Sequence, residues 1–300
     1  MLTGEQNARS EQRIERDMMT AERVALNLVT LKGEHDAKHL LHKVKTAAKA
    51  GFGGVGIWAE DTDAWLGSGK RLRDLHHAVT DQGMKVVELC EVTVCDGHGS
   101  VADRTREFAA AEGLAAPLVA VAYNNPGASL DEAKKDWTKF LDLLSDVEGV
   151  RAALHFKGDS RNLNTLDLAW DVVSAGPPNG CLLLDVYDFW LGQSPVSSLN
   201  AVPVELIGVV HLSDVKNVPR EKATMVDRTF PGEGVMPLTH IISTIVRRGY
   251  QGPFSVEIMG ECQHRECLET AEEAFRCARK LLGTSGPSHR KLPVARSKNS

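Results

Sequence analysis

Four side chains of the types that bind metal ions stand at the ends of four successive apolar runs. They are His155 in "RAALH", Asp185 in "CLLLD", His211 in "IGVVH" and Glu257 in "FSVE". Imidazole nitrogens and carboxylate oxygens together suit a divalent ion such as Mn²⁺, Zn²⁺, Co²⁺ or Fe²⁺. A single polar strand end is usually a hydrogen-bonded cap, but four buried without a counter-ion would cost about 1–3 kcal/mol for each unsatisfied group. The pattern therefore predicts one metal site.

These four runs belong to a regular alternation of short strand-like and longer helix-like segments. The predicted strands are residues 23–31, 53–58, 85–90, 117–123, 150–156, 181–187, 206–212 and 253–259. Eight strand–helix units favour an α/β protein with a (β/α)8 TIM barrel over an open sheet, which usually has five or six strands. The first strand also lacks the glycine-rich phosphate loop of the open-sheet alternative. Active sites of such barrels lie at the C-terminal ends of the strands, so we expect the four ligands to converge there.

The barrel is predicted to form a single domain over residues 23–284. Residues 1–22 alternate in charge and lack the apolar centre of a secretory signal, so we expect a short N-terminal extension and a cytoplasmic protein. Residues 285–300 are polar, basic and rich in Pro, Gly and Ser, which predicts a flexible tail. Cys90, Cys95 and His98 have no evident fourth partner, so no structural zinc site is expected from them.

Composition narrows the kind of partner. A net charge of −5, with 42% hydrophobic and 25% charged residues, describes an ordinary globular protein and gives no sign of a nucleic-acid-binding surface. No window reaches the roughly 18 apolar residues that a membrane span needs. We therefore expect a small soluble substrate, no nucleic acid and no membrane, and we leave a homo-oligomer open.

Several stretches resemble the sugar phosphate isomerase/epimerase superfamily, the xylose isomerase-like TIM barrels that include ketose 3-epimerases and inosose dehydratases. They are "ALNLVTLKG", "LLLDVYDFW", "VVHLSDV" and "RTFPGEGVMPLTHIISTIVRRGYQGPFSVEI", and the resemblance spans residues 23–283. Its most specific part is the R-x-x-P-G-x-G turn followed by a helix, then G-Y-x-G and a strand that ends in Glu.

The resemblance implies that Glu, Asp, His and Glu from four strand ends hold a divalent metal, which binds adjacent oxygens of a sugar or cyclitol. Asp185, His211 and Glu257 match three of these positions, and His155 stands in place of the first Glu. Asp188 stands where many members have a His. Glu257 is then expected to be both ligand and base, with His155 or Asp188 protonating the other side. The expected cofactor is one divalent ion, with Mn²⁺ first and Zn²⁺, Co²⁺ or Fe²⁺ as alternatives.

The expected chemistry begins with removal of a proton beside a metal-polarised carbonyl, which gives an enediolate-type intermediate. The hypothesis is a metal-dependent isomerase, epimerase or dehydratase of carbohydrate metabolism that acts on a sugar, keto-sugar or inosose. One alternative is a lyase that eliminates a glycosidic group from a 3-keto-sugar. Another is a barrel that has lost catalysis and binds a ligand or partner.

Four further residues are expected to contact the substrate. Arg228 lies in the Pro-Gly turn, and its planar fork can bind two oxygens of a substrate or of a metal-bound carboxylate. Lys157 and Lys216 follow strand ends, and Trp190 can form an apolar wall. Glu91, after the third predicted strand, is interpreted first as a solvated loop residue, with a place in the lining of the pocket as the alternative.

Overall fold

The computed structural model describes residues 21–95 and 104–283. The predicted flexible tail, His98 and all but the last two residues of the predicted N-terminal extension lie outside these ranges.

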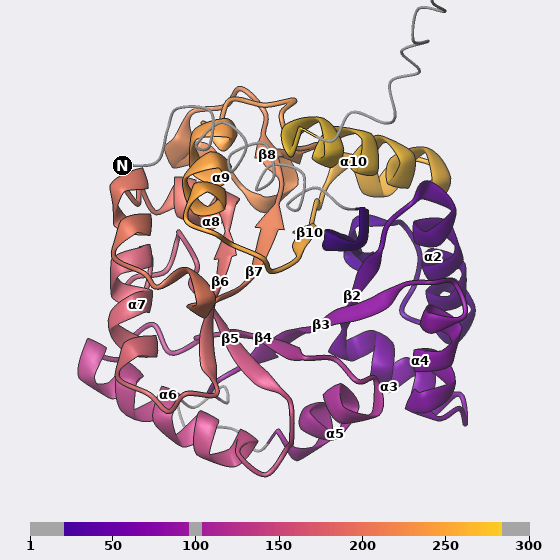
Figure 1. The fold of residues 1–300 in the computed structure, drawn as a ribbon, viewed down its shortest axis with the longest axis horizontal. Helices are drawn as coiled ribbons and strands as arrows, with labels where there is room; N and C mark the ends of the chain where they lie inside the picture. Colours follow the sequence, from indigo (N-terminus) through magenta and orange to yellow (C-terminus); the bar gives the residue numbers. More distant parts are fainter. Residues whose placement is uncertain (1–20, 96–103, 284–300) are drawn as a thin grey trace, which may run out of the picture.

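Eight parallel strands close into a barrel, which confirms the predicted (β/α)8 fold (Figure 1). The order around the barrel is β1-β10-β7-β6-β5-β4-β3-β2. The strands are β1 (Val24–Asn27), β2 (Gly54–Trp58), β3 (Lys85–Thr93), β4 (Leu118–Ala122), β5 (Arg151–His155), β6 (Gly180–Asp185), β7 (Ile207–Leu212) and β10 (Phe254–Val256). Most bounds lie within a few residues of the prediction, but β1 stops at Asn27 because a 3₁₀ turn follows it.

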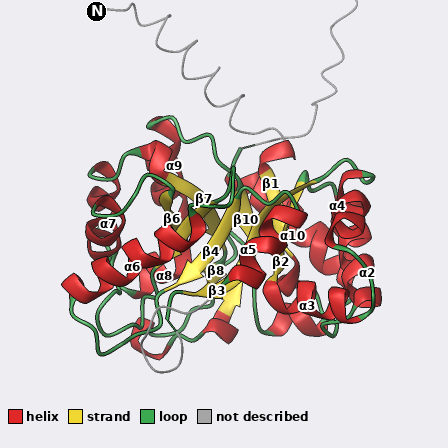
Figure 2. Ribbon diagram, turned by 90° about the horizontal axis from the view of Figure 1, so that it is seen from below, coloured by secondary structure: helices red, strands yellow, loops and turns green. Residues whose placement is uncertain are grey.

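Helices surround the barrel, as Figure 2 shows, and bury the outward faces of the strands. They are α2 (Ala37–Ala50), α3 (Ala59–Gly67), α4 (Leu72–Thr80), α5 (Thr105–Gly113), α6 (Leu130–Leu144), α7 (Leu166–Ser174), α8 (Val186–Leu191), α9 (Leu238–Arg247) and α10 (Cys267–Leu281). Short 3₁₀ turns are η1 (Ala21–Arg23), η2 (Leu28–Thr30), η3 (Val196–Asn200), η4 (Val204–Leu206), η5 (Arg220–Lys222), η6 (Met225–Asp227) and η7 (Glu261–His264). Across the described ranges, no helix combines the length and apolarity that a bilayer span requires.

The ends of these helices follow from local sequence. Asp36 accepts hydrogen bonds from the backbone N–H groups of Lys38 and His39 and so caps the start of α2. Gly51 ends the same helix with φ +101°, a left-handed conformation that glycine adopts without strain.

The barrel has its own apolar filling, separate from the layer between strands and helices. It consists of Cys90, Leu118, Ala120, Ala153, Cys181, Leu183 and Val209. Successive side chains on a strand point to opposite faces. His155, Asp185 and His211 stand two residues beyond Ala153, Leu183 and Val209, so they point into the same interior. The strand period thus aims three of the predicted ligands at the barrel axis.

The long charged segment after β7 folds into a two-stranded antiparallel ribbon, β8 (Asp214–Val215) and β9 (Arg228–Thr229). The carboxylate of buried Asp214 holds the turn that follows. It accepts backbone hydrogen bonds at 2.8–3.1 Å from Val215, Gly232, Gly234 and Met236. The ribbon and its turn place Arg228 over the C-terminal end of the barrel.

Gly234 leaves no room for a side chain, so we expect Gly234→Ala to destabilise the protein. A Cβ atom there would collide with the Val215 carbonyl oxygen and the Asp214 carboxylate. The expected loss is about 1–3 kcal/mol of unfolding free energy, typical of overpacking, measured by urea unfolding. Gly67→Ala is the control, because no atom lies within 4 Å of its added Cβ. Equal unfolding midpoints for the two variants would contradict the expectation.

Candidate metal and acid–base site

The four predicted ligands meet at the C-terminal end of the barrel and are all at least 97% buried. His155 is the last residue of β5, Asp185 the last of β6 and His211 the penultimate residue of β7, while Glu257 directly follows β10. Together with Asp188, these ligands belong to two groups of three residues, each with potential ligand atoms within 4.8 Å of one another. One group is Asp185, His211 and Glu257, and the other is His155, Asp185 and Asp188. Asp185 therefore joins two halves of the site.

Arg228 lies inside this cluster. Its guanidinium donates to Asp185 Oδ2 at 2.9 Å and to Glu257 Oε2 at 3.0 Å, and it lies 4.5 Å from the centre of the Tyr187 ring. Burial lowers the pKa of Arg228, but the charges of Asp185, Glu257 and Asp188 outweigh it and raise the pKa above its usual value. Burial raises the pKa of Asp185, but the charge of Arg228 together with the interactions of His155 and His211 outweighs this and lowers the pKa. The guanidinium thus keeps these buried carboxylates ionised.

His155 is surrounded by acidic groups. Its Nε2 donates to Asp188 Oδ2 at 3.0 Å and lies 3.5 Å from Asp185 Oδ2, while its Nδ1 lies 3.6 Å from Glu91 Oε2. Burial and the Lys157 charge lower the pKa of His155, but hydrogen bonds to Asp185, Asp188 and Glu91 outweigh them and raise it to about 10. In the protein without bound metal, the acidic neighbours thus favour the imidazolium form of His155.

The interpretation of Glu91 as a solvated loop residue is wrong. β3 continues to Thr93, so Glu91 lies within the strand, and its side chain is only 22% exposed. Glu91 Oε1 pairs with Lys157 Nζ at 3.0 Å, and Lys157 Nζ also lies 3.0 Å from His155 Nδ1. Burial raises the pKa of Glu91, but the charge of Lys157 together with the interactions of His155 outweighs this and lowers the pKa. Lys157 and Glu91 are thus a pair beside the His155 ring.

Asp188 is held from two sides. Its Oδ2 accepts from His155, and its Oδ1 accepts from the backbone N–H of Gly158 at 2.8 Å. A Cβ on Gly158 would lie 2.6 Å from the Asp188 carbonyl oxygen, so glycine permits this close approach. Asp188 is buried, and each of its two carboxylate oxygens thus accepts a hydrogen bond.

The other half of the site contains two residues that the sequence did not single out. Asn27, at the end of β1, donates from Nδ2 to Glu257 Oε1 at 3.1 Å and accepts from Trp58 Nε1 at 2.8 Å. Glu88, within β3, accepts from His211 Nε2 at 2.8 Å. Asn27 had a detectable signal, because it ends an apolar run in "RVALN" like the four ligands. Glu88 lies within the run "KVVELC" and had none.

The remaining predicted contacts lie around this cluster. Trp190 is buried in α8, and the Arg220 guanidinium covers its ring at 4.7 Å. Lys216 directly follows β8, is half-buried, and donates its backbone N–H to the Asp227 carbonyl at 3.0 Å. Cys90 and Cys95 are buried and form no disulfide bond among the described residues. The roles of Trp190 and Lys216 toward a substrate stay predictions.

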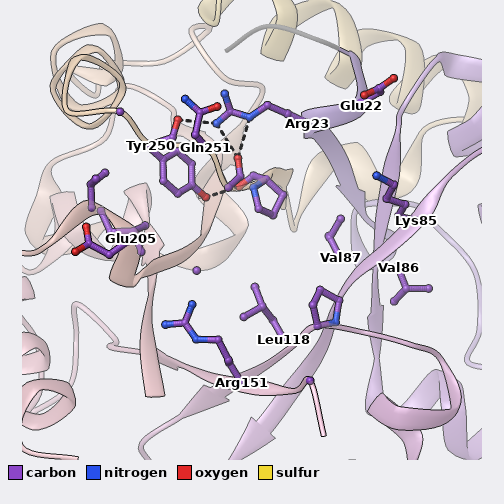
Figure 3. A pocket seen from close by; sticks show the side chains of 18 residues that line it. Glu22, Arg23, Lys85, Val86, Val87, Leu118, Arg151, Glu205, Tyr250 and Gln251 are labelled. Carbon is purple, nitrogen blue, oxygen red and sulfur yellow. Dashed lines mark hydrogen bonds between the residues drawn. The ribbon is translucent and has the colours of Figure 1, made fainter. Parts of the chain in front are cut away.

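A cavity of about 610 Å³ opens at the opposite end of the barrel (Figure 3). Lys85 and Arg151, the first residues of β3 and β5, line it together with Arg23. Arg23 donates to the carbonyl oxygens of Tyr250 at 2.9 Å and Gly252 at 2.9–3.2 Å, as the dashed lines in Figure 3 mark. Arg23 thus ties β1 to the segment before β10. In such barrels, the residues at the end opposite to the active site usually serve stability.

A closed (β/α)8 barrel with a buried cluster of histidines and carboxylates at its C-terminal end defines the class of this protein. A family model for the xylose isomerase-like TIM barrel matches residues 44–281, and the chain belongs to that family.

Its relatives are isomerases and dehydratases. The chain is 31% identical over 153 residues to an inosose isomerase of Halalkalibacterium halodurans, a match that covers 49% of this chain and 53% of that protein. It is 27% identical over 233 residues to a 3-dehydroshikimate dehydratase of Pseudomonas aeruginosa, which covers 74% of this chain and 36% of the relative. The chain thus spans about half the length of the inosose isomerase it matches.

Solved structures share the fold at lower identity. The structure of an IOLI protein with a bound zinc atom superimposes with a TM-score of 0.74 at 21% identity, covering 87% of this chain and 98% of that one. A xylose isomerase domain protein of Salmonella typhimurium gives a TM-score of 0.76 at 17% identity, covering 88% and 98%. These likenesses support the fold.

The raised pKa of His155 predicts how stability depends on pH in the protein treated with a chelator. An unfolded histidine has a pKa of about 6.5, and the folded value is about 10. The stabilisation from His155 is therefore complete below pH of about 6.5 and is lost as pH rises toward 10. We expect the free energy of unfolding to fall more steeply across this window in the wild type than in His155→Gln. Parallel curves from urea unfolding would contradict the charged imidazolium.

Proposed function

We propose that this protein is a divalent-metal-dependent isomerase or dehydratase that acts on a keto-cyclitol or keto-sugar. One observation carries the metal part of the proposal. His211 Nδ1 is buried and has no hydrogen-bond partner among the described residues, although it lies 3.4 Å from Glu257 Oε2. A buried nitrogen without a partner costs free energy. A metal ion between His211 and the carboxylates of Asp185 and Glu257 accounts for it.

The donor atoms present fit such an ion. Two carboxylates and one imidazole form one group, and His155 Nε2 lies on the other side of Asp185. Because His155 replaces a carboxylate of the resembled ligand set, the site carries one negative charge fewer. A mixed nitrogen and oxygen set favours Zn²⁺, Co²⁺ or Mn²⁺ over Mg²⁺. The zinc atom bound in the similar IOLI structure is in line with this preference.

Arg228 now neutralises the two carboxylates that an ion would bind. Burial lowers the pKa of His211, and the charges of Glu88 and Glu257 outweigh this and raise it. His211 must lose the proton on Nδ1 before it can bind an ion, so metal binding competes with protons and weakens as pH falls.

A bound divalent ion would polarise a substrate carbonyl and so acidify the neighbouring C–H bond. Glu257 is the base that we assign to this proton. Its Oε1 is fixed by Asn27 and its Oε2 by Arg228, so the carboxylate is held in one orientation. Arg228, through its Nε, which has no partner among the described side chains and backbone, offers a further donor to a substrate oxygen.

The two halves of the site carry different groups, a base in one and an acid in the other. This arrangement suits dehydration as well as isomerisation. Glu257 lies in one half, and the protonated His155 lies in the other. Loss of a β-hydroxyl as water needs a base for the carbon proton and an acid for the departing oxygen. His155 can donate that proton, and Asp188 and Asp185 stabilise its charged form. Isomerisation needs the same base, with the proton returned to a different atom.

A two-stage experiment tests this function. Metal analysis of the purified protein comes first, and we expect a divalent ion in equimolar amount. Incubation with inososes, keto-sugars and 3-dehydroshikimate in deuterium oxide follows, with deuterium uptake and water loss measured by NMR. Exchange without water loss indicates an isomerase or epimerase, and release of a glycosidic group indicates the lyase alternative. Absence of metal, with ligand binding that ignores chelators, would replace the enzyme by a binding barrel.

Removing either central ligand should abolish metal binding. We expect Asp185→Ala and His211→Ala to lower metal affinity by more than the roughly 10–100-fold typical of outer-shell changes. Circular dichroism should stay nearly native, although Asp185→Ala also loses a helix cap worth about 1 kcal/mol. Lys85→Ala, at the opposite end of the barrel, is the control. Full metal occupancy in both site variants would refute the ligand assignment.

Glu257→Gln should weaken catalysis far more than folding, because the amide keeps the shape of the side chain but cannot accept a proton. We expect deuterium exchange into a confirmed substrate to fall by about 10²–10⁴-fold, the usual contribution of a positioned base. Glu233→Gln, an exposed acid in the turn after β9, is the matched control. Unchanged exchange in Glu257→Gln would exclude Glu257 as the base.

A further inference from the structure

We infer that Glu88 is a positioning residue, which holds the His211 ring so that Nδ1 faces Asp185 and Glu257. This inference rests on the proposed metal site and adds a residue beneath it. It concerns the tautomer and orientation of one ligand, and Glu88 itself touches neither ion nor substrate.

Glu88 is fully buried, so its carboxylate needs a hydrogen-bond partner. Its exposed fraction is 0%, and it lies inside the barrel on β3, two residues before Cys90 of the apolar filling. A carboxylate is rarely buried in this way unless it is paired. Its partner is His211, whose Nε2 lies 2.8 Å from Oε2. An ionised carboxylate only accepts hydrogen bonds, so this contact places the hydrogen on Nε2.

The other ring nitrogen of His211, Nδ1, is the one that a metal ion can bind. With Nε2–H directed down to Glu88, Nδ1 points toward the rim, where it has no hydrogen-bond partner among the described residues. A histidine binds a metal through the nitrogen that carries no hydrogen, and a carboxylate on the other nitrogen fixes the ring and makes it a stronger ligand. Glu88 and His211 have this arrangement.

The backbone around Glu88 makes room for it. Gly56 faces Glu88 across the sheet, and a Cβ at Gly56 would lie 2.8 Å from Glu88 Oε1. The pairing of β2 with β3 also shifts by one residue there, because Val55 pairs with Val86 but Gly56 with Glu88. Such bulges redirect side chains near active sites. A glycine and a bulge thus turn one carboxylate toward His211.

A second metal ion is the rival interpretation, because Glu88, Cys90 and His211 also have potential ligand atoms within 4.8 Å. The geometry favours the positioning role. The 2.8 Å contact between Glu88 and His211 is a direct hydrogen bond, which leaves no space for an ion between them.

The test compares Glu88→Ala with Glu88→Gln. Glutamine keeps a carbonyl oxygen that can accept from Nε2, whereas alanine removes the acceptor. We expect Glu88→Ala to weaken Co²⁺ binding by about 10–100-fold and to change its visible absorption spectrum, while Glu88→Gln stays within a few-fold of the wild type. Imidazole nitrogen NMR on isotope-labelled, Zn²⁺-loaded protein should show the His211 hydrogen on Nε2 in the wild type and in Glu88→Gln.

Gly56→Ala gives a second route if Glu88→Ala fails to fold, because it crowds Oε1 and leaves the carboxylate in place. We expect it to shift the same spectrum in the same direction. Co²⁺ binding that is equal in the wild type, Glu88→Ala and Gly56→Ala would overturn the role of Glu88 and leave the metal site standing. Two equivalents of Co²⁺ with a thiolate charge-transfer band would replace it by a second ion site. A wild type that binds no Co²⁺ would overturn the metal site and this inference with it.

Discussion

The structure of the rim depends on the carboxylate of Asp185, whose two oxygens serve different purposes. Oδ1 accepts the backbone N–H groups of Tyr187 and Asp188 and so begins α8. Oδ2 meets the Arg228 guanidinium at 2.9 Å and lies 3.5 Å from His155 Nε2. Since a buried carboxylate is costly without partners, its position fixes β6, α8, β5 and the β8–β9 ribbon relative to one another. Both halves of the site are built outward from this one group.

The barrel and the strand-end residues could be predicted because both follow from local patterns. An apolar run that ends in a polar residue indicates where a strand stops, and the two-residue period of a strand indicates where that residue points. This reasoning located His155, Asp185, His211 and Glu257. Asn27 ends an apolar run in the same way, so the same reasoning could have found it.

Other residues of the site could not be predicted, because their placement depends on irregular or distant structure. β3 carries register shifts before Glu88 and between Leu89 and Val92, so a regular two-residue period cannot assign Glu88 and Glu91 to a face. The Arg228 contacts also span 43 residues to Asp185 and 29 to Glu257. The sequence predicted that Arg228 binds a substrate or a metal-bound carboxylate, and the folded ribbon identifies the carboxylates it contacts as those of Asp185 and Glu257.

The site also shows how the barrel tolerates so many buried charges. Each carboxylate at the rim has a cationic or N–H partner: Arg228 lies between Asp185 and Glu257, Lys157 pairs with Glu91, and His155 donates to Asp188. Breaking a buried pair by removing one partner typically costs about 3–5 kcal/mol, so these contacts constrain one another. Three buried atoms of this network have no hydrogen-bond partner among the described residues, namely His211 Nδ1, Arg228 Nε and Glu88 Oε1. Of these, His211 Nδ1 is aimed at two carboxylates, and a nitrogen in that position is what a site for an added cation requires.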